Sequence, residues 1–145
     1  FPFQFLIIII FFQIIIGAFV SGLDAGRIYQ TWPLMGSTYF PNDILLSNFS
    51  FLFDFKNHSL VQFYHRNIAY FIILYSFVLS INIYKKKIYK LYKPMFILLF
   101  VLILQITFGI VTLISGLNIF IASAHQILGV LLVFSAVNLY YFKAN

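Results

Sequence analysis

Residues 3–20 read FQFLIIIIFFQIIIGAFV, an apolar run that only Gln4 and Gln13 interrupt. A helix needs about 20 apolar residues to cross the hydrocarbon layer of a bilayer, so this run is long enough to span it. Exposed backbone amides find no partners in lipid, and a spanning segment of this kind is therefore helical. The run predicts a membrane helix at about residues 3–22.

Three further apolar segments follow and complete a predicted four-helix bundle. They are expected at about residues 60–84, 95–115 and 119–142. We expect the third helix to start just after Pro94, because proline is favoured at the start of helices. The tight connection at 116–118 makes the last two helices neighbours, so the order is up, down, up and down. The fold class is all-α integral membrane, with a single domain over residues 1–145.

Composition and charge support this class. Of the 145 residues, 63% are hydrophobic and 8% are charged, whereas soluble proteins carry about a quarter charged residues. There is no cysteine, which excludes a disulfide scaffold and a thiol nucleophile. Most of the cations follow the second and fourth helices: Lys85, Lys86, Lys87, Lys90, Lys93 and Lys143. The positive-inside rule then places both termini on the cytoplasmic or matrix side, and cations grouped at a membrane boundary do not indicate a nucleic-acid partner.

The first two helices are joined by an outer loop at about residues 23–59, which is rich in Gly, Pro, Asn and aromatic residues. Its aromatic cluster is Phe49, Phe51, Phe53 and Phe55. Aromatic side chains are enriched at headgroup depth, so we expect this loop to lie at the membrane interface. We interpret Trp32 in the same way, as an aromatic anchor at the membrane interface. The alternative is that Trp32 contacts a partner. The chain opens on Phe1 without an initiator methionine or a signal peptide, and we expect it to be part of a longer protein.

The two helix pairs carry a similar pattern, which we interpret as an internal repeat. Each pair has a glutamine, a glycine four residues later, a Ser-Gly-Leu-Asx turn and a histidine on its second helix. In the first pair these are Gln13, Gly17, residues 21–24 and His65; in the second they are Gln105, Gly109, residues 115–118 and His125. The first copy continues into a long loop, whereas the second makes a tight turn.

The two histidines are the candidate ligands of a cofactor, because ionisable residues within a span are costly and usually functional. His65 lies about five residues below the outer start of its helix and His125 about six, so both lie roughly 8 to 9 Å below the outer surface. With no third ligand, a zinc or copper ion would be under-coordinated, whereas a haem iron needs only two axial ligands. The pattern favours haem ligation by His65 and His125. The alternative is that each histidine only hydrogen-bonds a neighbouring helix or relays protons.

Other residues near this level have two interpretations. Small residues leave room for a flat macrocycle, or simply let helices approach closely; they are Gly17, Ala18, Ser21, Gly22, Gly109, Ala122, Ser123, Ala124 and Gly129. Arg66 is placed to pair with a haem propionate, or extends to the membrane surface as a free cation. His58 is interpreted as a loop or interface residue, since no residue of the fourth helix matches its height.

Several motifs in this order resemble one known family. They are GAFVSGLDAG at 17–26, WPLMG at 32–36, LVQFYHR at 60–66 with Ala69-Tyr70, QITFG at 105–109 and AHQ at 124–126. The chain resembles the C-terminal half of haem A synthase, of the cysteine-free kind found in proteobacteria and mitochondria. The resemblance covers nearly the whole chain.

The resemblance implies an eight-helix protein made of two similar four-helix halves. This enzyme oxidises a methyl group of haem O to the formyl group of haem A for cytochrome oxidase assembly. Its C-terminal half is associated with haem b, and His65 and His125 match the two ligands of that half. An essential glutamate belongs to the N-terminal half, and this chain has no glutamate. The catalytic residues are therefore unknown, and the half alone is expected to be inactive.

The same resemblance implies partners and a location. The substrate and product, haem O and haem A, would be reached through the missing N-terminal half. Besides the lipid bilayer, the candidate partners are a second copy of the chain and haem O synthase. The location implied is the inner membrane of a bacterium or a mitochondrion. Two alternatives stay open: a non-catalytic bis-histidine electron carrier like cytochrome b, and a small transporter or scaffold.

Overall fold

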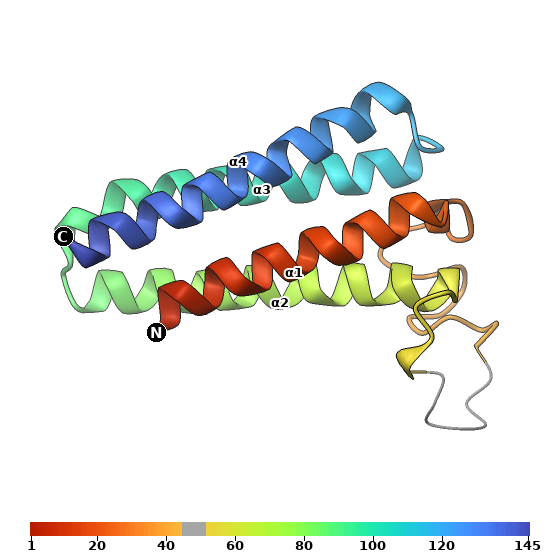
Figure 1. The fold of residues 1–145 in the computed structure, drawn as a ribbon, viewed down its shortest axis with the longest axis horizontal. Helices are drawn as coiled ribbons and strands as arrows, with labels where there is room; N and C mark the ends of the chain where they lie inside the picture. Colours follow the sequence, from red (N-terminus) through yellow and green to blue (C-terminus); the bar gives the residue numbers. More distant parts are fainter. Residues whose placement is uncertain (45–51) are drawn as a thin grey trace.

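Four long helices form the computed structural model, which describes residues 1–44 and 52–145 (Figure 1). The elements are α1 (Pro2–Gly22), η1 (Ala25–Arg27), α2 (His58–Lys85), η3 (Tyr89–Leu91), α3 (Tyr92–Ile114) and α4 (Ile119–Ala144). All four α-helices are long and apolar enough to cross a membrane. Within the described residues the only β-type pairing is one isolated bridge, between Met35 and Thr38. The predicted all-α membrane fold class is confirmed.

The helices pack as two hairpins, α1 with α2 and α3 with α4 (Figure 1). In Figure 1 the connections alternate between the two ends of the bundle, and both termini lie at the end that holds the turn between α2 and α3. We call this lysine-rich end the inner end. The opposite end, where α1 leads into the long connection to α2, is called the outer end.

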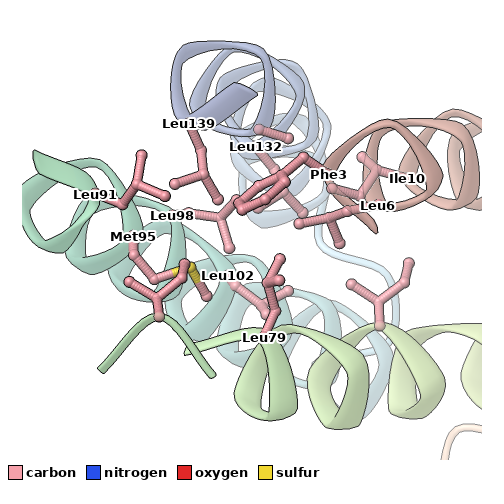
Figure 2. Close-up of a cluster of buried hydrophobic side chains, with 13 residues drawn as sticks. Phe3, Leu6, Ile10, Leu79, Leu91, Met95, Leu98, Leu102, Leu132 and Leu139 are labelled. Atoms are coloured by element: carbon pink, nitrogen blue, oxygen red, sulfur yellow. The ribbon is translucent and has the colours of Figure 1, made fainter. Parts of the chain in front are cut away.

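A hydrophobic core cluster, drawn in Figure 2, takes its residues from the inner halves of all four α-helices and from η3. Its buried members are Phe3, Leu6, Ile10, Ile72, Leu79, Ile83, Leu91, Met95, Leu98, Leu102, Leu132, Ala136 and Leu139. On α3 the buried residues end at Leu102, and on α4 they begin only at Gly129. The outer turns of these two helices therefore contribute no buried side chain. His125 lies on this part of α4, whereas the first hairpin keeps buried residues near His65, namely Ile16 on α1 and Val61 and Gln62 on α2.

Two helix starts differ from the sequence-based expectation. The predicted start of the second helix at residue 60 is too late, because α2 begins at His58. The Asn57 side chain caps this helix, and its Oδ1 accepts from the Leu60 N–H at 3.0 Å. The predicted start of the third helix after Pro94 is also wrong, since α3 begins at Tyr92. Pro94 then lies in the first turn of α3. Proline is tolerated there because the first N–H groups of a helix have no acceptor within the helix. α4 runs on to Ala144, slightly beyond the predicted end.

The connection between α1 and α2 folds back onto the outer end of α2. The Tyr29 carbonyl accepts from Gln62 Nε2 at 2.9 Å and from Arg66 Nη2 at 3.0 Å. Arg66 Nη1 also donates to the Leu34 carbonyl at 3.2 Å. The Trp32 indole is half-exposed and donates to the Tyr70 hydroxyl at 3.1 Å, so α2 holds this residue as well.

The later part of the connection is anchored through Asp43. Ser59 donates to Asp43 Oδ2 at 2.6 Å, and the Tyr29 hydroxyl donates to Asp43 Oδ1 at 2.7 Å. Of the predicted aromatic cluster, Phe53 is strongly exposed and Phe55 packs against Phe19 and Tyr64. The other two members, at 49 and 51, lie outside the described residues.

Candidate haem-ligand site

The structure brings the two predicted ligands together across the bundle. The imidazole rings of His65 and His125 have centroids 6.5 Å apart and are inclined at 79° to each other. His65 lies on α2, seven residues after its first residue, and His125 lies on α4, six residues after its first residue. The two side chains thus approach from different hairpins at matching depth.

This separation suits two imidazoles that share one metal. A metal–imidazole bond is about 2 Å long, and a ring nitrogen lies about 1 Å from the ring centre, so two rings on opposite sides of one metal have centroids about 6 Å apart. No cluster of three or more His, Cys, Asp or Glu side chains is found in the described part of the chain. The donor set therefore fits a metal whose other ligands come from elsewhere, as in haem.

His125 is held by α3. Its Nδ1 lies 3.0 Å from the main-chain carbonyl oxygen of Gln105. A carbonyl oxygen only accepts, so Nδ1 carries the proton and Nε2 keeps a free lone pair. Gly109 makes room for the ring, because a Cβ at this position would lie 2.8 Å from His125 Cε1. Metal-bound histidines are commonly oriented by such a hydrogen bond, which the second ring nitrogen donates.

His65 is held by α1, through a side chain instead of the backbone. Gln13 Nε2 donates to the His65 main-chain carbonyl at 2.9 Å, and it lies 3.2 Å from Nδ1 and 3.4 Å from Nε2 of the ring. Gly17 leaves space for the ring here, since a Cβ would lie 3.0 Å from His65 Cε1. Each hairpin therefore repeats one unit, in which a glutamine and a glycine one turn later face the histidine of the paired helix.

Two buried oxygens at this site have no hydrogen-bond partner within the described residues, Gln13 Oε1 and Gln105 Oε1. Unpaired buried polar atoms are uncommon and need an explanation. The sequence analysis used both glutamines only as markers of the repeat and did not assign them contacts. The spacing Gln-x3-Gly was the available signal, because residues four apart share one helix face.

Two other predicted residues lie elsewhere. Arg66 is half-buried and donates to the carbonyls of Tyr29 and Leu34 in the outer connection, and its contact with a propionate stays a prediction. His58, predicted to be a loop or interface residue, does not lie in the loop; it is the first, exposed residue of α2, and its place at the membrane interface stays a prediction. Its position at the outer end, a full two turns before His65, keeps it away from the facing pair.

Comparison with known proteins matches residues 3–137 to the COX15-CtaA family, described as "Cytochrome oxidase assembly protein". The chain belongs to this family. Curated relatives named "Heme A synthase" include those of Pelagibacter ubique, 40% identical over 141 residues, and of Wolbachia from Brugia malayi, 41% identical over 128 residues. A third, from Rickettsia felis, is 40% identical over 126 residues. These names place the family among oxidoreductase enzymes and confirm the resemblance identified from the sequence.

The coverage is unequal. The alignments include 96%, 88% and 87% of this chain but only 40%, 36% and 37% of the three relatives. The chain thus spans about two fifths of their length. No solved structure gives a significant match to it.

Proposed function

We propose that this chain is the C-terminal, haem b-binding half of a haem A synthase, with His65 and His125 as the axial ligands of the iron. The observation that carries the proposal is their pairing across the two hairpins, with ring centroids 6.5 Å apart. The family membership and the relatives named "Heme A synthase" support the same activity.

The residues of this level fit the cofactor in three respects. The two imidazoles come from different hairpins, and Gly17 and Gly109 leave space beside the rings. Two glutamine oxygens at this site also lack a partner within the described residues. When bound, haem supplies an iron that accepts and passes on electrons during the oxidation of the haem O methyl group. The chain itself supplies the two ligands and orients them through α1 and α3. Arg66 offers further N–H groups to a propionate, because a guanidinium has five donors.

The membrane orientation belongs to the same proposal. The inner end carries the lysine-rich turn and both termini, and positively charged segments are retained on the cytoplasmic or matrix side. The haem would then lie near the opposite surface of a bacterial or mitochondrial inner membrane. A second copy of the chain and haem O synthase remain proposed partners, along with haem O and haem A bound to the other half.

One observation favours a second candidate, a non-catalytic electron-transfer module. The chain has no glutamate, and its three aspartates, Asp24, Asp43 and Asp54, lie outside the four long helices, so no carboxylate lies within a span. A bis-histidine haem without an acid or base nearby can still carry electrons. The two candidates agree on the ligands and differ only in whether the protein converts haem O.

The test uses the full-length protein purified from membranes of cells with ample haem. We expect a low-spin b-type optical spectrum that is lost in His65→Ala and in His125→Ala and is kept in His58→Ala. His58 is the matched control, because it is an exposed histidine on the same helix as His65. A spectrum that survives both ligand variants, with folded protein, contradicts the proposal. Conversion of supplied haem O to haem A then separates the synthase from the electron carrier.

A further inference from the structure

The turn between α2 and α3, at the inner end of the bundle, carries a cluster of lysines and no acidic residue (Figure 1). Five exposed lysines lie within residues 85–93: Lys85, Lys86, Lys87, Lys90 and Lys93. The three aspartates of the chain belong to the connection at the outer end, and the ion pair found within the described residues, between Arg27 and Asp24, lies there too. We propose that the lysine turn binds the headgroup of an anionic phospholipid, and that a groove between α2 and α3 holds one of its acyl chains.

The groove lies on the seam between the two hairpins and has a volume of about 320 Å³. Its lining residues on α3 extend from Tyr92 to Leu99, which is about 10 Å along the helix axis at a rise of 1.5 Å per residue. Ile83 and Met95 in this lining are buried, whereas Phe96 is 70% exposed. The groove thus offers an apolar surface to a hydrocarbon chain that extends from the lysine turn into the bilayer.

Two tyrosines connect the groove with the lysines. Tyr84 and Tyr92 line the end of the groove that is nearest to the turn, and their rings are stacked with centroids 5.9 Å apart. Each tyrosine is followed directly by a lysine, Lys85 or Lys93. Tyrosine is enriched at headgroup depth, and lysine clusters beside a membrane span attract anionic headgroups. The phosphate and the acyl chain of one lipid therefore find the lysines and the groove at the same place.

The turn itself is fixed by the backbone, and one of its lysines occupies a position that favours glycine. The Lys87 N–H donates to the Tyr84 carbonyl at 3.0 Å, and the Ile88 N–H donates to the Ile83 carbonyl at 3.2 Å. These two bonds form a Schellman motif, in which the first donor residue has a left-handed backbone and is usually glycine. Lys87 takes this place with a φ of 53°, a conformation that glycine adopts without steric cost. A strained lysine on a fixed turn indicates that its side chain has a use there.

The positive-inside rule is the simpler explanation of the lysines, and it makes a different prediction. That rule concerns how the chain is oriented in the membrane, and it requires neither the groove nor a lysine at the strained position. A lipid that binds the folded protein but not the unfolded chain stabilises the folded state. The inference does not rest on the proposed function, since this turn lies at the opposite end of the bundle from the two histidines.

The experiment measures the melting temperature of the full-length protein in a neutral detergent, with phosphatidylglycerol, phosphatidylcholine or glycerophosphate added. We expect an upward shift with phosphatidylglycerol alone, because phosphatidylcholine has no net charge and glycerophosphate has no acyl chain. No shift with phosphatidylglycerol overturns the proposal. An equal shift with phosphatidylcholine or with glycerophosphate also overturns it, because the site then does not require both parts of an anionic lipid.

Variants test the headgroup contact and the groove separately. The double variant Lys85→Gln with Lys93→Gln removes the charges beside the groove, and we expect it to lose most of the phosphatidylglycerol shift. Ser80→Phe places a bulky ring in the groove, where Ser80 is half-buried, and we expect the same loss. Lys87→Gly relieves the backbone strain, so we expect a higher melting temperature without lipid and a smaller shift with it. Lys56→Gln is the matched control, an exposed lysine at the outer end that should keep the full shift.

The outcomes are decisive because the two lysine substitutions are exposed and leave three lysines in the turn. A full shift in the double lysine variant overturns the proposal, as does an equal loss of the shift in Lys56→Gln, which would indicate a general effect of charge. A full shift in folded Ser80→Phe or in Lys87→Gly also contradicts it. If Ser80→Phe does not fold, the double lysine variant and its control decide.

Discussion

The two hairpins share a sequence pattern but connect their helices in different ways. In the first, α1 continues through Gly22, and Asp24 turns the chain with a φ of 51°. In the second, α3 ends at Ile114, and the turn is made by Gly116 and Leu117 with φ of 72° and 64°. The same Ser-Gly-Leu-Asx residues therefore adopt two conformations, one opening into a long folded connection and one closing a tight turn.

The difference shows which part of the repeat is constrained. Glutamine, glycine and histidine lie on the helices before or after the turns, and in both hairpins they meet at the same level. The turns can diverge because each only has to connect the end of one helix to the start of the next at the outer end of the bundle. They still meet each other, since a Cβ on Gly26 would lie 2.9 Å from Leu117 Cδ2. The ligand level is thus the common feature of the two hairpins.

The largest expected effect comes from adding a methyl group beside each histidine. In Gly109→Ala the new Cβ would lie 2.8 Å from His125 Cε1 and 3.2 Å from Nδ1, whereas in Gly17→Ala it would lie 3.0 Å from His65 Cε1. Displaced ligands lower metal affinity by about 10- to 100-fold, and we expect the greater loss in Gly109→Ala, where the ring is also tied to the backbone.

The haem content per purified protein, read from the b-type spectrum, checks this order. Gly22→Ala is the matched control, because a Cβ there has no atom within 4 Å, and we expect it to keep its haem. Equal haem content in Gly109→Ala and Gly22→Ala would show that the second hairpin does not constrain its histidine as described.

A second prediction concerns the connection that only the first hairpin has. Arg66→Met removes two hydrogen bonds from a charged donor to the Tyr29 and Leu34 carbonyls, and we expect this connection to lose about 2 kcal/mol of local stability. Faster amide hydrogen exchange at residues 23–44, with unchanged exchange at the α3–α4 turn, is the measurement. Arg27→Met serves as the control, since its ion pair with Asp24 is strongly exposed and contributes little. Similar exchange in both variants would refute the anchoring role of Arg66.

A third prediction tests a feature that the hairpins share. The second helix of each begins after an asparagine: Asn57 Oδ1 accepts from Leu60 N, and Asn118 Oδ1 accepts from Phe120 N at 3.0 Å and from Ile121 N at 3.4 Å. Replacing such a cap by alanine costs about 1 kcal/mol, so we expect a similar loss of thermal stability in detergent for Asn57→Ala and Asn118→Ala.

Asn82→Ala is the control for the two caps. Asn82 lies exposed within α2, where alanine is the better helix former, and we expect no loss of stability. A loss confined to one of the two cap variants would mean that only one hairpin depends on its cap.

Much of this molecule could be predicted from its sequence. The long apolar runs determine the four helices, and the two histidines stand out because few other ionisable residues lie within spans. The start of α2 was missed because His58 and Ser59 are polar, so hydropathy places them outside the span although the Asn57 cap begins the helix there. The contacts of Gln13 and Arg66 depend on how α1 and the outer connection pack on α2, and a single sequence gives no such register. The ligand role of His65 and His125 stays a prediction until the spectra are recorded.

The smallest expected effect is a pH dependence of the first hairpin alone. Burial tends to raise the pKa of Asp43, but hydrogen bonds from Ser59 and Tyr29 outweigh it and hold this pKa below its usual value of 3.8. A carboxyl whose pKa is lower in the folded state stabilises it fully above the unfolded pKa, and this contribution is lost as the pH falls through the folded value. We therefore expect hydrogen exchange in residues 23–44 to accelerate below about pH 4 relative to the α3–α4 turn, whose residues 114–119 include no carboxylate. Asp43→Asn should exchange faster at neutral pH and lose most of this acceleration, whereas the exposed Asp24→Asn should behave like the wild type. An acceleration that persists unchanged in Asp43→Asn would assign the pH dependence to another group.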